Sequence, residues 1–214
     1  MLKLNFNKEA LNLYLVTDRS WISDRSLNED VKKALEAGVT FLQLREKNID
    51  KESFLKSAMQ LKSLAADYKV PFVINDDVEI ALASDADGVH IGQNDMTVIG
   101  ARQKIGRDKI LGVSVRSVEE AKYAERLGAD YLGVGAVFIT DTKLDAADVS
   151  YEVLKEICAS VKIPVVAIGG INDKNITQLE GSGIYGVAVI SAILAQKDIK
   201  GAATALAQQC RQLF

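Results

Sequence analysis

The chain has 214 residues, of which 48% are apolar and 26% are charged, and its formal net charge is −3. This length allows one domain with a large core, because α/β barrels routinely reach it. The small negative charge provides no basic field for nucleic acid, and no apolar run approaches the roughly 18 residues that a transmembrane helix needs. We therefore expect a globular protein with no nucleic-acid or membrane partner.

Composition also bears on compartment and domain organisation. The first eleven residues contain no uncharged apolar segment and no small-residue cleavage site, so we expect no secretory leader. The only cysteines are Cys158 and Cys210, which favours buried thiols in a reducing cytoplasm over a disulfide. No linker or low-complexity segment interrupts the sequence, so residues 1–214 are predicted to form a single domain. A homo-oligomer is compatible with the sequence, which does not specify one.

Short apolar runs alternate with segments of helical spacing along the whole chain. The apolar runs, each predicted to be a strand, cover residues 13–16, 39–44, 70–74, 88–91, 110–114, 131–135, 164–168 and 186–190. The helical segments cover residues 27–37, 51–67, 78–83, 98–105, 118–127, 151–160 and 174–179, and further helices continue to residue 214. This alternation predicts a parallel sheet.

A weak internal repeat supports the same interpretation. The segments that begin at Glu36, Ser84, Leu127 and Ser182 share one layout, in which a helix end is followed by a glycine and then by a strand. Glycine suits this place because it closes a helix in the left-handed conformation without Cβ strain. Eight such units predict an α/β fold, a single (β/α)₈ TIM barrel. A doubly wound open sheet is the alternative, but no Gly-x-Gly-x-x-Gly follows the first strand.

Two aspartates follow neighbouring strands of the predicted sheet. Asp76 comes after the apolar run 72–74, and Asp95 comes after the run 89–91. Adjacent parallel strand ends lie roughly 5 Å apart, and two carboxylates so close repel each other unless a cation lies between them. Oxygen ligands favour Mg²⁺, which takes one or two carboxylates and leaves its other positions to water and substrate phosphate. The alternative is that both aspartates cap the helices that follow.

Basic side chains follow the second predicted strand. Gln43, Arg45 and Lys47 are spaced by two, so an extended chain places them on one face, while Leu44 lies on the opposite face. Arginine can grip phosphate oxygens with two hydrogen bonds, and lysine adds a point charge. The alternative for Arg45 is an internal salt bridge with Glu46 or an aspartate.

Glycines and small residues follow the seventh and eighth predicted strands. Gly169 and Gly170 precede a short helix, where backbone N–H groups can hold a phosphate, and Ile190 with Ser191 would complete that corner. His90, the only histidine, is interpreted as a hydrogen-bonded interior residue, with a base as the alternative. Tyr14 and Trp21 are interpreted as packing or lip residues.

A long polar connection follows the sixth predicted strand. It runs through residues 137–149 and carries Lys143. Long connections in compact domains often form lids, so we expect closure over bound ligand, with a disordered connection as the alternative.

Several stretches together resemble thiamine-phosphate synthases. They are Gln43-Leu-Arg-Glu-Lys47, Ile74-Asn-Asp-Asp77, Gly88-Val-His-Ile-Gly-Gln-Asn-Asp95, Thr140-Asp-Thr-Lys143 and Ala167-Ile-Gly-Gly-Ile171, in order over nearly the whole chain. The resemblance implies a transferase that joins 4-amino-5-hydroxymethyl-2-methylpyrimidine diphosphate to 4-methyl-5-(2-phosphooxyethyl)thiazole, or its carboxylate. The products would be thiamine phosphate and diphosphate, formed with Mg²⁺ through a pyrimidine-stabilised methylene cation.

The resemblance also implies roles for individual residues. The pyrimidine diphosphate would be held by the segment Gln43, Leu44, Arg45, Glu46 and Lys47 together with Asn75, Ser114 and Lys143. Arg45, Lys47, Ser114 and Lys143 would act in catalysis, and Asp76 and Asp95 would hold the metal. The thiazole phosphate would be held by Thr140, Asp141, Thr142, Gly170, Ile190 and Ser191.

The sequence departs from the family pattern in two places. Gly135-Ala136-Val137-Phe138-Ile139 lacks two expected prolines, which predicts a more mobile loop, and Arg116 stands where we expect a histidine. Three alternatives remain: a thiazole tautomerase of the same superfamily, a phosphosugar isomerase or aldolase, and a non-catalytic phosphate-binding barrel. Paired aspartates with Lys143 argue against the first, the lack of an inward lysine on the sixth strand argues against an aldolase, and the cost of clustered charges without a ligand argues against the third.

Overall fold

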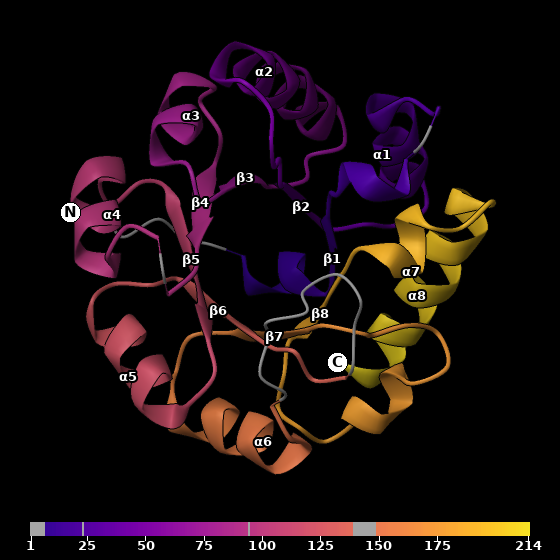
Figure 1. The fold of residues 1–214 in the computed structure, drawn as a ribbon. Helices are drawn as coiled ribbons and strands as arrows, with labels where there is room; N and C mark the ends of the chain where they lie inside the picture. The colour runs from indigo at the N-terminus through magenta and orange to yellow at the C-terminus, as the bar shows by residue number, and fades with distance from the viewer. Residues whose placement is uncertain (1–6, 23, 94, 139–148) are drawn as a thin grey trace.

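The computed structural model describes residues 7–22, 24–93, 95–138 and 149–214, and its eight parallel strands close into a barrel (Figure 1). The strands are β1 (Leu13–Val16), β2 (Phe41–Leu44), β3 (Phe72–Asn75), β4 (Gly88–Ile91), β5 (Ile110–Val115), β6 (Tyr131–Val134), β7 (Val165–Ile168) and β8 (Gly186–Val189). Each strand pairs with its neighbours in sequence, and β8 pairs with β1. The barrel prediction is confirmed and the open-sheet alternative is wrong.

Helices form a ring outside the barrel, as Figure 1 shows. They are α1 (Leu27–Glu36), α2 (Lys51–Asp67), α3 (Val78–Ala83), α4 (Val98–Ile105), α5 (Val118–Arg126), α6 (Tyr151–Ser160), α7 (Ser191–Leu194) and α8 (Ile199–Leu213). The described residues also include three short 3₁₀ helices: η1 (Lys8–Leu11), η2 (Arg19–Trp21) and η3 (Ile176–Leu179). The predicted helix at 174–179 is therefore a single 3₁₀ turn, and the other element boundaries agree within about two residues.

Two of the four repeat segments end their helices as predicted. Gly38 and Gly128 follow the C-caps of α1 and α5 with φ of 106° and 97°, the left-handed region in which glycine carries no Cβ strain. Gly183 also has a positive φ, 88°, but it lies four residues beyond the end of η3. In the segment that begins at Ser84 the prediction is wrong, because Asp85 takes this conformation, with φ of 51°. Gly88 instead begins β4, where a Cβ would lie 2.1 Å from the carbonyl oxygen of Ile110. Its glycine allows two strands to approach closely.

Apolar side chains form two layers. Alternation along β1 sends Leu13 and Leu15 outward to pack against the helices, while Tyr14 and Val16 point into the barrel. Both faces of the sheet are thus buried, which explains why the strands read as continuous apolar runs. Aromatic rings pack edge to face inside the barrel and fill part of its axis. The cavity described below lies at the carboxyl ends of the strands.

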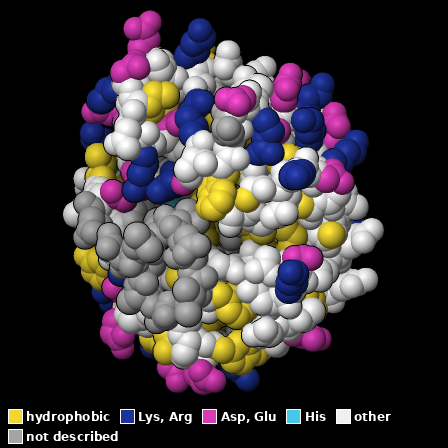
Figure 2. All heavy atoms as spheres, turned by 45° about the vertical axis from the view of Figure 1, so that its right-hand side comes forward, with side chains coloured by type: hydrophobic (Ala, Val, Ile, Leu, Met, Phe, Trp, Pro, Cys, Tyr) yellow, Lys and Arg dark blue, Asp and Glu magenta, His cyan; other side chains and the backbone are white. Residues whose placement is uncertain are grey.

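The surface charges and the two cysteines can be compared with the composition. Figure 2 shows acidic and basic side chains interspersed over one face of the molecule. Within the described ranges no helix has the length and hydropathy that crossing a bilayer requires. Cys158 and Cys210 are both free thiols, as expected, but only Cys210 is fully buried, whereas Cys158 is partly exposed.

Candidate active site

A cavity of about 430 Å³ opens at the carboxyl ends of the strands. Ten residues predicted for the site line it: Gln43, Arg45, Lys47, Asn75, Asp76, Asp95, Ser114, Gly170, Ile190 and Ser191. Thr140, Asp141, Thr142 and Lys143 lie outside the described residues, as does most of the predicted lid at 137–149. The barrel therefore brings together side chains that are up to 148 positions apart in the sequence, as Gln43 and Ser191 are.

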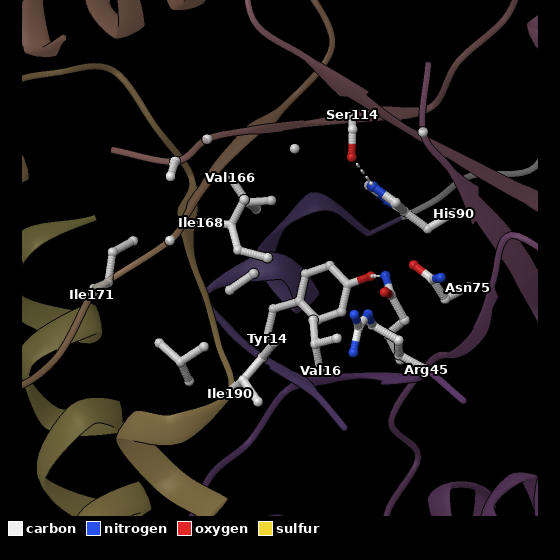
Figure 3. A pocket seen from close by; sticks show the side chains of 18 of the residues that line it. Tyr14, Val16, Arg45, Asn75, His90, Ser114, Val166, Ile168, Ile171 and Ile190 are labelled. Carbon is white, nitrogen blue, oxygen red and sulfur yellow. Dashed lines mark hydrogen bonds between the residues drawn. The ribbon is translucent and has the colours of Figure 1, made fainter. Parts of the chain in front are cut away.

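The cavity has two chemically different sides (Figure 3). One side carries polar groups from the ends of β2 to β5, and the labelled examples are Arg45, Asn75, His90 and Ser114. The other side is apolar, comes from β7, β8 and the turns after them, and includes Val166, Ile168, Ile171 and Ile190. Such a cavity can orient one charged, hydrogen-bonding ligand against a second, more apolar one.

The residues after β2 alternate as their spacing predicts. Gln43 and Arg45 line the cavity, whereas Leu44 is fully buried among the side chains between sheet and helices and cannot contact a ligand there. Glu46 likewise does not line the cavity, because its carboxylate pairs with Arg19 at 2.7 Å. The structure thus places Leu44 and Glu46 outside the set that can meet substrate through a side chain.

Arg45 combines a cavity position with an internal ion pair. Its Nη1 lies 2.5 Å from Oδ2 of Asp18, an aspartate that follows β1, so this part of the alternative interpretation is correct. The backbone is braced as well, since the N–H of Arg45 donates to Oγ1 of Thr17 at 3.0 Å. Partial burial would raise the pKa of Asp18, but hydrogen bonds from Ser20 and the charge of Arg45 outweigh burial and hold that pKa below its usual range. The ion pair therefore fixes the orientation of the guanidinium at the cavity.

The two aspartates do not cap helices. The N-cap of α3 is Asp77, whose Oδ1 accepts from Ile80 N at 2.9 Å, and the N-cap of α4 is Thr97. Asp76 instead has φ of 65° and donates its N–H to the carbonyl of His90, which places it at the cavity. The capping alternative is wrong because the turn after each strand sends one polar residue to the cavity and a later one to the helix.

The aspartate pair fits a magnesium ion by its chemistry. Asp76 and Asp95 both line the cavity, and Oδ2 of Asp95 accepts the N–H of Gly92 at 2.7 Å, which orients that carboxylate. Among the described residues no group of three or more His, Cys, Asp or Glu side chains forms a metal cluster. Two carboxylates suit Mg²⁺, which keeps several positions for water and substrate phosphate.

Sequence reasoning missed a buried hydrogen-bond network. Tyr14 was expected to be a packing or lip residue, and Tyr131 was not singled out, yet their hydroxyls lie 2.8 Å apart inside the barrel. His90 is an interior hydrogen-bonded residue as predicted, with Nδ1 2.9 Å from the Tyr131 hydroxyl and Nε2 2.9 Å from Ser114 Oγ. Gln93 was also missed, and it donates to the Ser114 carbonyl at 2.6 Å. The sequence contained one signal for Tyr14: in a strand, alternate residues face the same side, so Tyr14 and Val16 both point into the barrel.

The corner after β7 and β8 has the predicted glycine turn. Gly169 and Gly170 have φ of 102° and 66°, and the carbonyl of Gly170 accepts from the side chains of Asn172 and Asn175. Ile190 and Ser191 face the same cavity. Positive φ at both glycines turns the backbone around the cavity wall, a form that suits a phosphate group.

Arg25 connects the end of α7 to the neighbouring helix α1. It donates to the carbonyls of Leu194 and Gln196 at 2.5 and 3.0 Å, and its Nε pairs with the buried Asp30 at 2.9 Å. The end of α7 is thereby tied to α1, so the corner is held from outside the cavity. Arg116 lines the cavity, in the place where a histidine was expected.

Comparison with known proteins places this geometry in a family. A family model described as thiamine monophosphate synthase matches residues 13–193. A thiamine-phosphate synthase of Clostridium acetobutylicum is 54% identical over 188 residues, covering 88% of this chain and 89% of that protein. One of Ruminiclostridium cellulolyticum is 52% identical over 200 residues, covering 94% and 95%.

The solved structure of a thiamine phosphate pyrophosphorylase from Pyrococcus furiosus has a TM-score of 0.90 and 41% identity, and covers 97% of this chain and 98% of that chain. The family match runs from β1 to α7 and so includes every strand that contributes to the cavity. The chain belongs to the thiamine monophosphate synthase family.

Proposed function

We infer that the cavity joins a pyrimidine diphosphate to a thiazole phosphate and releases diphosphate, the thiamine-phosphate synthase activity for which the relatives are named. The observation that carries this function is the two-sided cavity at the barrel mouth. A diphosphate needs cationic side chains and a metal site. The polar side offers Arg45 and Lys47 as cations and the aspartate pair as metal ligands. A thiazole with a phosphoethyl chain needs an apolar wall and a phosphate corner, which the other side offers.

We propose that the polar side holds the pyrimidine diphosphate. Arg45, held by Asp18, would contact the diphosphate with Lys47, and Asn75 and Ser114 would hydrogen-bond the pyrimidine end. Mg²⁺, when bound by Asp76 and Asp95, would neutralise charge on the departing diphosphate. The cationic side chains would do the same from the protein.

The apolar side would position the second substrate. Gly170, Ile190 and Ser191 would hold its phosphate, while Ile168 and Ile171 would pack against the thiazole ring. This arrangement presents the ring nitrogen to the pyrimidine methylene carbon as its bond to oxygen breaks, and it excludes the water that would otherwise react there. Thr140, Asp141, Thr142 and Lys143 are proposed from the sequence alone to complete both sites.

One experiment tests the function directly. The purified protein is mixed with both substrates and Mg²⁺, and thiamine phosphate is measured; omission of either substrate or addition of EDTA should abolish the product. Arg45→Ala should abolish carbon–nitrogen bond formation and leave thiazole phosphate binding near normal. The control is Arg126→Ala, which removes a cation that lies over the Tyr123 ring on α5, away from the cavity.

The same assay separates a synthase from a tautomerase. A tautomerase moves a proton within one substrate and needs a base but no leaving-group site. Turnover of the thiazole carboxylate in EDTA, with no thiamine phosphate formed from the two substrates, would reverse the assignment.

A further inference from the structure

Five side chains form a continuous hydrogen-bond chain across the barrel interior. Gln43 Nε2 donates to the hydroxyl of Tyr14, which lies 2.8 Å from the hydroxyl of Tyr131. The Tyr131 hydroxyl lies 2.9 Å from His90 Nδ1, and His90 Nε2 lies 2.9 Å from Ser114 Oγ. Figure 3 shows the last link and the Tyr14 ring at the cavity floor. Four of the five residues line the cavity, and Tyr131 connects Tyr14 to His90 from within the barrel.

The link between Tyr131 and His90 depends on a glycine between them. His90, Gly112 and Tyr131 are register partners on β4, β5 and β6, so their side positions lie in one row inside the barrel. A Cβ on Gly112 would lie 2.3 Å from the Tyr131 hydroxyl and 2.5 Å from His90 Nδ1, where no atom fits. A Cβ on Gly133 would lie 3.1 Å from His90 Cε1. Two inward positions without side chains therefore leave the space in which the tyrosine and the histidine meet.

A chain of this kind has two internally consistent directions. Each hydroxyl donates one hydrogen bond, and neutral imidazole donates from one nitrogen and accepts at the other, so the direction at one end determines every link. If the chain runs from Gln43 to Ser114, His90 carries its proton on Nε2 and the Ser114 hydrogen points away from His90. In the opposite direction the proton lies on Nδ1 and the Ser114 hydrogen is donated to His90.

One observation favours the first direction. The Gln43 amide presents its nitrogen to Tyr14, and an amide nitrogen only donates. Burial raises the pKa of Tyr14 and of Tyr131, so both phenols stay protonated at neutral pH and can carry the direction set at Gln43 through to His90.

We propose that the chain runs from Gln43 to Ser114, and that Tyr14, Tyr131 and His90 are positioning residues that turn the Ser114 hydroxyl into a hydrogen-bond donor toward the cavity. Ser114 then recognises an acceptor atom, and Gln43 keeps its carbonyl oxygen for a donor group. A ligand with an aromatic nitrogen acceptor and an amino donor fits this pair. Its identity as the aminopyrimidine rests on the proposed function, whereas the direction of the chain does not.

The single histidine makes the direction measurable. With ¹⁵N-labelled histidine, a long-range ¹H–¹⁵N spectrum of the ligand-free protein reports which ring nitrogen of His90 carries the proton, without overlap from any other histidine. The expected result is the Nε2–H tautomer. The Nδ1–H tautomer would overturn the proposal, and this measurement needs no variant and no substrate.

Tyr131→Phe tests the positioning role. Loss of the donor to Nδ1 should shift His90 toward the Nδ1–H form and raise KM for the pyrimidine diphosphate about tenfold, as expected for one lost hydrogen bond. The matched control is Tyr151→Phe, which removes a hydroxyl bonded to the Glu180 carbonyl on the exterior and should change neither quantity.

A double variant distinguishes positioning from general damage. Because Tyr131 is proposed to act through Ser114, Tyr131→Phe should raise KM much less in a Ser114→Ala background. Equal effects in both backgrounds, or an unchanged tautomer in Tyr131→Phe, would refute the positioning role. If the wild-type protein formed no thiamine phosphate, the proposed function would fail while the tautomer would still decide the direction of the chain.

Discussion

The guanidinium of Arg45 and the carboxylate of Asp18 form an ion pair at the mouth of the barrel, with Nη1 and Oδ2 separated by 2.5 Å. Only 9% and 14% of the two side chains are exposed, so the pair is largely shielded from water. Asp18 also caps η2 through Ser20. One carboxylate thereby holds both the loop after β1 and the arginine after β2.

Asp18→Asn should loosen Arg45 and preserve the cap, because an asparagine oxygen can still accept from Ser20. We expect KM for the pyrimidine diphosphate to rise about tenfold, with KM for the thiazole phosphate nearly unchanged.

Since the pKa of Asp18 in the folded protein is lowered, its contribution to stability is present above the usual pKa range of a carboxyl group and is lost as pH falls through the pKa of the folded state. The variant should therefore lose less stability in acid. Asp85→Asn, which breaks an exposed pair with Lys109, is the control, and an unchanged KM in Asp18→Asn would contradict the assignment.

The paired aspartates predict a specific metal dependence. Asp76→Asn and Asp95→Asn should each raise the Mg²⁺ concentration needed for half-maximal activity and reduce turnover by a factor of about 10² or more, because each removes a charged ligand. Titration of activity with MgCl₂ measures both effects. Asp77→Asn is the matched control, since Asp77 caps α3 and an asparagine cap preserves that bond. Equal metal dependence in all three variants would exclude a shared ion.

Gly112→Ala should disrupt the barrel interior. The new Cβ would lie 2.2 Å from Tyr131 Cζ in a fully packed layer, and such overpacking typically reduces the free energy of unfolding by about 1–3 kcal/mol. Urea denaturation followed by circular dichroism measures the loss. Ser63→Ala provides the comparison, because Ser63 is an exposed position within α2, where alanine favours the helix. Equal stability of Gly112→Ala and wild type would show that the aromatic layer can shift.

Arg25 should matter for only one of the two substrates. Arg25→Lys replaces a forked donor that bridges Leu194 and Gln196 by a single ammonium, so the corner at α7 should loosen and KM for the thiazole phosphate should rise severalfold. KM for the pyrimidine diphosphate should stay near normal. Lys33→Met controls for charge near the buried Asp30, since Lys33 lies 3.7 Å from it. A parallel rise in both KM values would indicate general destabilisation instead.

The buried thiol of Cys210 predicts alkaline destabilisation. Burial raises its pKa to about 12, above the roughly 8.5 of an unfolded chain. Its contribution is thus fully present below about pH 8.5 and is lost as pH rises toward the folded value, at up to ~1.4 kcal/mol per pH unit. The stability difference between wild type and Cys210→Ala should therefore narrow between pH 8 and pH 10 in urea titrations. A difference that stays constant with pH would show that the thiol does not titrate differently in the two states.

Much of the fold and part of the site follow from local sequence patterns. Each strand is a short apolar run, and its alternation determines that Leu44 faces the helices while Gln43 and Arg45 face the cavity. The residues after parallel strands must meet at one end of the barrel, which brings Asp76 and Asp95 to the same cavity without any knowledge of long-range contacts. Side-chain alternation repeats every two residues, and the site residues follow each strand within a few positions, so the sequence alone determines both.

Only the tertiary structure decided which side chains become partners. Tyr14 and Tyr131 are 117 positions apart, and their hydroxyls meet because closure of the barrel brings β1 and β6 across one interior and Gly112 leaves the space. Arg45 likewise pairs with Asp18 and not with another aspartate, because the barrel places the loops after β1 and β2 side by side. The helix caps are Asp77 and Thr97, because the turns after β3 and β4 direct Asp76 and Asp95 to the cavity. Register, closure and turn geometry are properties of the assembled barrel, and no local pattern in the chain contains them.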